Sequence, residues 1–360
     1  MTLPLRGIRV IELSGIGPSR YCGMLLADLG AEVVLVERPG QQPRRADTVV
    51  ARGRRGITLD LKQSGDVETL LRLVERADVL IEPYRPGVAE RLGIGPEHCQ
   101  ARNPGLVYGR MTGWGQDGPL AGTAGHDIGY IAVTGVLDAI GRADGPPQVP
   151  LNLLGDFAGG SMFLLTGILA GLWQRQRTGA GTVVDAAIID GTVSLASFIL
   201  GLRADGEWSD GRGTNLLDTG APYYDVYETS DGGWMAVGAI EPKFYAELLR
   251  VLELSGLPPQ NDRETWPQLR AALAARFRER TREMWTRAFH GTDACVAPVL
   301  NFAEAAEHPQ IAARGSLTMR AGHLISAVAP RLSTAPNEPA RDPVAPGSDT
   351  EAVLRDWCGD

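Results

Sequence analysis

Two residues stand out as candidates for acid and base chemistry, His126 and Asp156. His126 lies in the segment GHDIGY (125–130), where glycines let a loop approach a substrate and the imidazole titrates near neutral pH. Asp156 lies in LLGDFAGG (153–160), where a helix start and small residues would expose backbone N–H groups to a developing negative charge. From spacing alone each residue has a simpler interpretation, His126 as an ordinary loop histidine and Asp156 as a helix N-cap.

A glycine-rich turn, GIGPSR (15–20), follows an apolar run and is similar to the phosphate-binding turn of dinucleotide-binding proteins. Glu37, at the end of the next apolar run, would be the acid that binds a ribose. The pattern fails where Arg20 replaces the third glycine and where Pro18 removes a backbone N–H. We therefore do not expect NAD or FAD binding.

Several cations stand next to predicted strand ends, where ligands of open α/β sheets bind. For each of them a solvated surface position is the alternative, but as a group they favour an anionic ligand. These residues are Arg38, Arg52, Arg54, Arg55, Lys62 and Arg85.

The elements that would position these residues alternate between strand and helix in the first part of the chain. Such alternation predicts βαβ units and a parallel sheet, and hence an α/β fold. The predicted strands are 8–13, 31–37, 57–61 at an edge, 77–82 and 106–111, with helices over 18–30 and 64–76.

The second part of the chain has a different pattern. It predicts a long apolar helix from about 156 to 176, a strand at 182–188, a helix at 191–202 and a linker at 203–214. Short antiparallel strands over 222–240, helices over 242–292 and an extended strap over 327–347 follow.

Composition excludes several classes of protein. The 360 residues carry a net charge of −8, which argues against a general binder of nucleic acid. The four cysteines form no C-x-x-C pair, and we see no metal-ligand spacing, nucleophile elbow or P-loop. The N-terminus lacks the features of a signal peptide, and the apolar run 162–173 is too short to span a membrane. We expect a cytoplasmic enzyme without a membrane partner.

Taken together, the motifs resemble a known family nearly from end to end. They include LLADLGAEVVLVERP (25–39), RMTGWGQDGP (110–119), GDFAGGSMFLLTGILAGLW (155–173) and VGAIEPKFY (237–245). The chain resembles the family III CoA-transferase superfamily and, within it, the α-methylacyl-CoA racemases of actinobacterial type. The pair GHD and GD-x-x-GG separates these racemases from the transferases, which share the aspartate and generally lack the histidine.

The resemblance implies roles for individual residues. His126 and Asp156 would be the two acid/base groups on opposite faces of the α-carbon of a 2-methylacyl thioester, with His126 serving the S epimer and Asp156 the R epimer. Glu241 would pair with the imidazole, and Asp127 would complete the catalytic set. Backbone N–H groups near Asp127 and at the start of the Asp156 helix would hold the enolate oxygen.

The same resemblance implies a binding site for the acyl-CoA substrate, with no cofactor and no metal. The residues that would bind substrate and CoA are Arg38, Leu59, Asp60, Leu61, Lys62, Tyr84, Arg85, Arg91, Gly125, Ile128, Gly129 and Tyr130. The implied activity is racemisation of 2-methylacyl-CoA in lipid metabolism. The alternatives are CoA transfer with Asp156 as nucleophile, and binding of acyl-CoA without turnover.

The implied architecture has a large Rossmann-like CoA-binding domain over 1–202, to which 316–360 returns, and a smaller inserted α+β domain over 203–315. Two chains would interlock as a homodimer, and Glu241 would reach the active site from the partner chain. The sequence departs from its relatives at GPSRYC (17–22), where Arg20 and Tyr21 stand near the expected acyl path, and in TVSLASFILGL (192–202), which lacks methionine. Arg20 would contact a charged or polar group on the acyl chain or on CoA, or else pair with a surface carboxylate.

Overall fold

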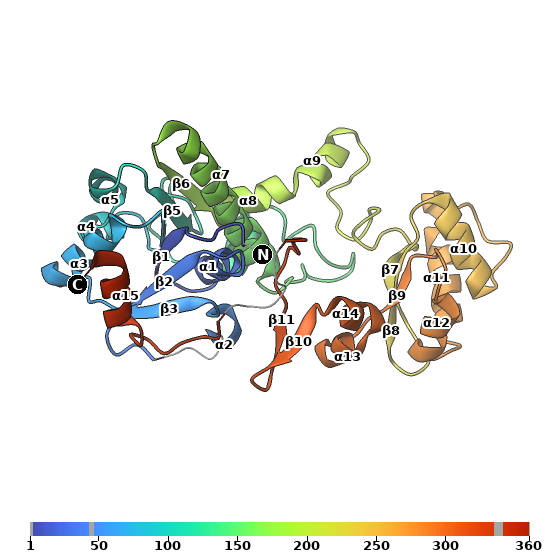
Figure 1. The fold of residues 1–360 in the computed structure, drawn as a ribbon. Coiled ribbons are helices and arrows are strands. Elements are labelled where there is room, and N and C mark those ends of the chain that lie inside the picture. Colours follow the sequence, from blue (N-terminus) through green and yellow to red (C-terminus); the bar gives the residue numbers. More distant parts are fainter. Residues whose placement is uncertain (1–2, 43–46, 335–340, 360) are drawn as a thin grey trace. The chain divides into compact units, whose positions relative to one another are not determined.

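The structure, a computed structural model, describes residues 3–42, 47–334 and 341–359. Its contacts divide the chain into two compact units, whose elements are labelled in Figure 1. The first unit comprises 1–134, 150–196 and 312–360, and the second comprises 135–149 and 197–311. The segment 135–149, which the sequence placed with the large domain, thus groups with the second unit.

A parallel sheet of six strands forms the centre of the first unit and confirms the predicted α/β class. Its spatial order is β3-β2-β1-β4-β5-β6, the order of a Rossmann sheet. The strands are β1 Arg9–Leu13, β2 Glu32–Glu37, β3 Arg54–Thr58, β4 Val79–Glu82, β5 Val107–Thr112 and β6 Thr182–Ala187. β3 lies at the edge, as expected, but begins three residues before the predicted 57–61.

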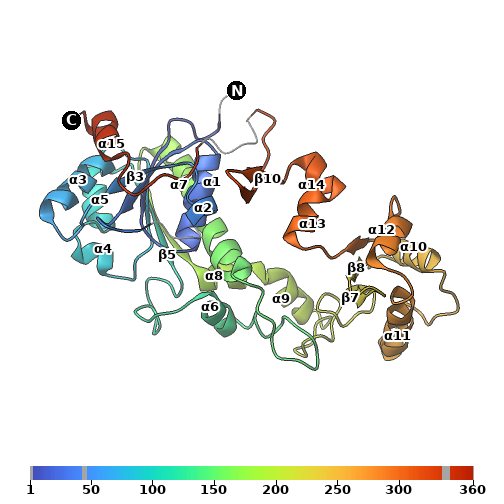
Figure 2. The same cartoon turned by 90° about the horizontal axis from the view of Figure 1, so that it is seen from below.

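Both faces of this sheet are buried, which explains why its strands read as continuous apolar runs. Val10 and Val33 face one core with α1 (Pro18–Asp28) and α7 (Met162–Thr178). Ile11 and Val34, one residue later, face the other core. Figure 2 shows the helices of that second face, α3, α5 and α15, on the opposite side of the sheet from α1 and α7. They span α3 Ser64–Val74, α5 Pro96–Arg102 and α15 Thr350–Cys358.

The direction of chain progression reverses between β1 and β4, which lie side by side at the centre of the sheet. Loops that leave the carboxyl ends of two such strands diverge, and the crevice between them is where Rossmann-like sheets bind ligands. The short helices α2 (Asp47–Val50), α4 (Val88–Arg91) and α6 (Asp127–Val133) follow β2, β4 and β5 along the chain.

The long apolar helix begins earlier than expected and has two parts. Leu153–Ser161 is a π-helix, and α7 continues from it. Among the described residues this stretch, Leu153–Thr178, is long and apolar enough by length and composition to cross a membrane, unlike the run 162–173 that the sequence singled out. It packs on β5, β6 and α1, with Leu164 and Ile168 fully buried, as core helices of globular proteins do.

The second unit has its own core beneath a three-stranded antiparallel sheet in the order β7-β8-β9. Trp285 and Phe277 are fully buried there and meet edge to face, with ring centroids 5.5 Å apart. The antiparallel pair around 230–233 and the helices after it agree with the sequence prediction. The elements are α9 Ser197–Ala204, β7 Tyr224–Glu228, β8 Trp234–Gly238, α10 Pro242–Leu252, α11 Trp266–Phe277, α12 Arg282–Phe289, β9 Val296–Pro298 and α13 Phe302–Glu307.

The C-terminal segment returns to the first unit. Arg52 fixes the hairpin of β10 (Leu317–Arg320) and β11 (His323–Ser326), because its guanidinium binds Asp28 and donates to the Ser326 carbonyl at 2.8 Å. Part of the predicted strap over 327–347 lies outside the described residues, namely 335–340. Beyond that gap the Gly53 N–H donates to the Arg341 carbonyl at 2.9 Å.

Candidate active site

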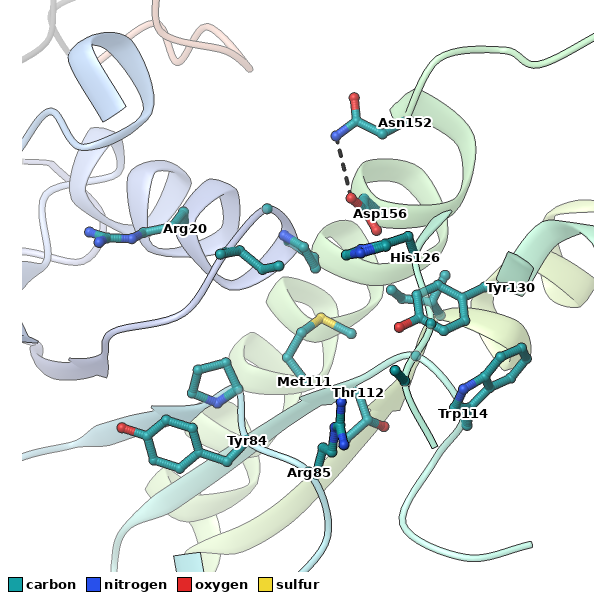
Figure 3. A pocket seen from close by; sticks show the side chains of 18 of the residues that line it. Arg20, Tyr84, Arg85, Met111, Thr112, Trp114, His126, Tyr130, Asn152 and Asp156 are labelled. Carbon is teal, nitrogen blue, oxygen red and sulfur yellow. Dashed lines mark hydrogen bonds between the residues drawn. The ribbon is translucent and has the colours of Figure 1, made fainter. Parts of the chain in front are cut away.

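A cavity of about 620 Å³ opens at the carboxyl edge of the central sheet (Figure 3). Loops that follow β1, β4 and β5 line it, together with the start of α6 and the π-helix. Its position between the β1 and β4 loops is the crevice that the strand order predicts. His126 and Asp156 both line this cavity.

His126 occupies the N-cap position of α6, with extended backbone and an exposed side chain. The loop before it packs tightly against Tyr130, because a Cβ on Gly125 would overlap the tyrosine ring. Tyr130 in turn meets Trp114 edge to face, with ring centroids 4.7 Å apart. This aromatic support fixes the loop that presents His126, and Figure 3 shows its side chain and that of Asp156 in the same cavity.

Asp156 is the fourth residue of the π-helix, so the interpretation of this residue as an N-cap is wrong. Asn152, one turn earlier, holds the N-cap position and donates from Nδ2 to Asp156 Oδ2 at 3.3 Å. Burial raises the pKa of the Asp156 carboxyl, and the nearby charge of Asp127 raises it further. The hydrogen bond from Asn152 and the charge of His126 act in the opposite direction on that pKa.

Asp127 lies behind the cavity rather than in its wall. Its side chain is buried, and its Oδ2 accepts the backbone N–H of Asp156 at 2.7 Å. That N–H is therefore engaged within the protein, so among the backbone N–H groups near Asp127 and at the helix start it is not one that could bind an enolate oxygen. Binding of that oxygen by the other N–H groups stays a prediction. Only Gly155 permits the contact, because a Cβ at this position would overlap the Asp127 carboxylate.

The predicted substrate-binding residues fall into several places. Tyr84, Arg85, Gly125 and Tyr130 line the cavity with the acid/base pair. Burial raises the pKa of Tyr130, with a further increase from Asp156 and a decrease from Arg85. Ile128 is exposed and Gly129 half-buried on α6, and neither lines the cavity.

The other predicted CoA-binding residues surround the carboxyl edge of the sheet. Arg38 follows β2 directly and is exposed, and its charge lowers the pKa of Tyr84, which burial raises. Residues 59–62 form the loop after β3, in which the N–H of Lys62 donates to Asp60 Oδ1 at 3.2 Å. Leu59 is 5% exposed and, with the half-buried Leu61, packs in the core instead of facing a ligand. Arg91 is exposed at the end of α4.

Arg20 has a different role from the expected acyl contact. Arg20 borders the cavity, but its guanidinium points away from His126 and Asp156 (Figure 3). The side chain is 2% exposed and lies 3.3 Å from Glu37, so its partner is a buried carboxylate rather than a surface one. The Arg54 guanidinium, which pairs with Glu12 at 2.8 Å, also donates to the Arg20 carbonyl. An Arg at this helix start is thus explained by a core ion-pair network.

Tyr21 packs on Phe157, with ring centroids 4.9 Å apart. Both border a second, mostly apolar hollow of about 380 Å³ that also contacts Met24 and Met162. Tyr21 therefore lies beside the acid/base cavity and not within its lining.

Glu241 is in the second unit, at the N-cap position of α10. Its pairing with His126 stays a prediction. Within the described residues no group of three or more His, Cys, Asp or Glu side chains could hold a metal ion.

Two contributors to the site escaped the sequence interpretation. Asn152 could have been found from its spacing, because residues four apart face the same side of a helix. Trp114 gave no local signal, since its role depends on Tyr130 packing against it. What remains is a carboxyl and an imidazole on one cavity beside exposed cations, an arrangement able to move protons on an anionic substrate.

Comparison with known proteins identifies the family. Residues 5–350 match the model of CoA-transferase family III. Alpha-methylacyl-CoA racemase of Mus musculus is 47% identical over 98% of this chain and 93% of its own length, and that of Homo sapiens 46% identical over 99% and 94%. The crystal structure of a CaiB/BaiF family protein from Brucella suis superposes with a TM-score of 0.84 at 26% identity, covering 99% of this chain and 100% of that one. The chain belongs to CoA-transferase family III.

Proposed function

We propose that this protein is a racemase that interconverts the R and S epimers of 2-methylacyl-CoA thioesters. The observation that carries the proposal is that His126 and Asp156, from two separate elements, line one cavity. The names of the mouse and human relatives support it, because each covers nearly the whole chain.

In the proposed reaction one residue removes the α-proton and the other returns a proton to the opposite face. For the R epimer the Asp156 carboxylate takes the proton, and the C–H electron pair moves onto the thioester oxygen to give an enolate. Protonated His126 then donates a proton to the α-carbon, which restores the thioester with S configuration. For the S epimer neutral His126 is the base and protonated Asp156 is the acid.

This cycle needs two arrangements of one proton that are close in energy. An unperturbed carboxyl is far more acidic than an imidazole, which titrates near pH 6.5. Burial raises the pKa of Asp156 and so brings it closer to the pKa of an ordinary imidazole. Both groups and the thioester supply the chemistry, so we propose that no cofactor takes part.

Charge at the carboxyl edge supports CoA as the carrier of the acyl group. Arg38, Lys62 and Arg85 are exposed and form no ion pair within the described part of the chain. They follow β2, β3 and β4, three strands of the same parallel sheet. Cations in that arrangement suit the phosphates of CoA. We propose that the adenosine diphosphate portion binds there and that the thioester reaches the acid/base pair past Tyr84 and Tyr130.

We also propose an interlocked homodimer in which the partner's Glu241 pairs with His126. Uncovered apolar side chains support an extensive interface. In the first unit Trp173 is 65% exposed and Leu195 45%, and in the second Phe198 is 66% and Leu200 51% exposed. An interface between two chains would remove these apolar side chains from water, which favours association.

The alternative activity is CoA transfer between carboxylic acids, with Asp156 as nucleophile and a mixed anhydride as intermediate. His126 on the same cavity favours racemisation, because transfer needs no second base. Incubation of a single 2-methylacyl-CoA epimer in D2O without an acceptor acid tests this. Deuterium entry at the α-carbon with loss of chirality supports the racemase. Movement of CoA to an added acid without exchange supports the transferase, and neither result would leave a binding protein without turnover.

A further inference from the structure

We propose that Asp127 is a positioning residue for the reaction: its carboxylate fixes the backbone at Asp156 and places an uncompensated negative charge behind the reacting carboxyl. This inference rests on the proposed function. It assigns to Asp127 an action through Asp156 instead of contact with substrate, which its place behind the cavity wall disfavours.

The backbone contact is short and enclosed. Asp127 Oδ2 accepts a hydrogen bond from the Asp156 N–H at 2.7 Å, and Asp127 as a whole residue is 7% exposed. The carboxylate sits where a side chain on Gly155 would otherwise lie. Because residue 155 is glycine, the first turn of α6 can approach the π-helix directly.

The π-helix explains why such support is needed. A π-helix bonds each N–H to the carbonyl five residues earlier, so the N–H groups of its first turn have no partner within it. Asp156 is the fourth residue of that helix, and Asp127 supplies the missing acceptor. On the other side, the buried Ser161 hydroxyl lies 3.1 Å from the Asp156 carbonyl and donates to the Pro18 carbonyl at 2.8 Å. The Asp156 N–H is thus held by Asp127, while the Asp156 carbonyl and the Pro18 carbonyl share one hydroxyl donor, Ser161.

The charge of Asp127 is not neutralised by a cation in the described part of the chain. No ion pair there involves it, and its buried Oδ1 has no hydrogen-bond donor among the same residues. The charged or titratable groups that influence Asp156 are Asp127 and His126 from α6, with Tyr130 on the same helix, while Arg85 acts on Tyr130. Of these, Asp127 raises the pKa of Asp156 and His126 lowers it.

Asp127→Ala and Asp127→Asn separate the two actions. The alanine variant loses the acceptor, and a displaced Asp156 should lower kcat about 10- to 100-fold in both directions. The asparagine variant keeps an acceptor oxygen and should recover kcat to within about threefold of wild type at its own pH optimum. Both limbs of its pH profile of kcat/KM should move to lower pH, because a charge that favours the protonated pair is gone.

Gly155→Ala tests the contact without touching a charge, and Gly65→Ala, where a Cβ meets nothing within 4 Å, is its matched control. Gly155→Ala should lower kcat as Asp127→Ala does, and it takes over the test where Asp127→Ala does not fold by circular dichroism. Wild-type kcat in Asp127→Ala, or an Asp127→Asn profile with unmoved limbs, overturns the inference while the proposed function stands. Absence of α-proton exchange by the wild-type enzyme overturns both.

Discussion

Arg20→Ala should destabilise the first unit rather than alter the choice of acyl chain. Arg20 and Glu37 are a buried ion pair, with side chains 2% and 6% exposed. Removal of one partner of such a pair costs about 3–5 kcal/mol, because a buried carboxylate loses the charge that balances it. Glu37 also accepts a hydrogen bond from Gln41 Nε2 at 3.3 Å, which reduces this cost. Here Glu12, the other carboxylate near Arg20, keeps its 2.8 Å contact with Arg54, which places the cost near the lower limit.

A cost of about 3 kcal/mol corresponds to a melting temperature roughly 6 °C lower, since 1 kcal/mol shifts a domain of this size by about 2 °C. The assay is thermal unfolding by circular dichroism at one fixed protein concentration. Arg177→Ala is the matched control, because Arg177 is exposed and forms no ion pair in the described chain. Its effect should stay below about 0.5 kcal/mol.

Kinetics provide the second measurement for Arg20→Ala. A change transmitted through α1 should alter kcat/KM equally for plain and carboxylate-bearing acyl chains. An unchanged melting temperature together with a KM raised only for the carboxylate-bearing substrate would refute the buried-pair reasoning and restore the acyl contact.

Three further predictions follow from the site and its surroundings. His126→Ala and Asp156→Ala should each slow racemisation at least about 100-fold, measured by loss of optical rotation, and near-wild-type rates in either variant would contradict the acid/base assignment. Burial raises the pKa of Glu82 to about 7, so the folded state binds its proton more tightly than the unfolded state, and stability should fall as pH rises from about 4.5 to 7. Glu82→Gln should weaken that dependence in melts at pH 5 and pH 7, and an identical slope in both proteins would rule Glu82 out as its source. Sedimentation at nanomolar protein should show dimer, and a folded monomer would contradict the interlocked assembly.

The strands of the central sheet could be predicted because each one leaves a local pattern in the sequence. Strands buried on both faces, such as β1 and β2, appear in sequence as short apolar runs bounded by turns. β3 was placed three residues too late because it begins with Arg54 and Arg55, whose charges disguise a strand. Those charges are tolerated there because Arg54 pairs with the fully buried Glu12, a partner 42 residues away in sequence.

The site was predictable in its residue types and not in its support. His126 and Asp156 attract notice because few side chains transfer protons near neutral pH. The π-helix that carries Asp156 has no comparable signature in the sequence, since the acceptor for the Asp156 N–H is supplied by Asp127 from α6. Likewise the buried partner of Arg20 lies on β2, which a local view of the helix start could not supply.

The role of the glycines near Asp156 also could not be predicted from the sequence alone. In the sequence they suggested backbone N–H groups open to a developing negative charge. In the structure Gly159 and Gly191 are close-packing positions, because a Cβ on Gly159 would overlap Thr192 and one on Gly191 would overlap the Gly159 carbonyl. Their small size lets α8 (Ile188–Leu195) pack directly on the π-helix, as Gly155 lets Asp127 do from α6. Because these glycines have no side chain, α6 and α8 pack directly against the π-helix that carries Asp156. The position of the reacting carboxyl depends on this packing.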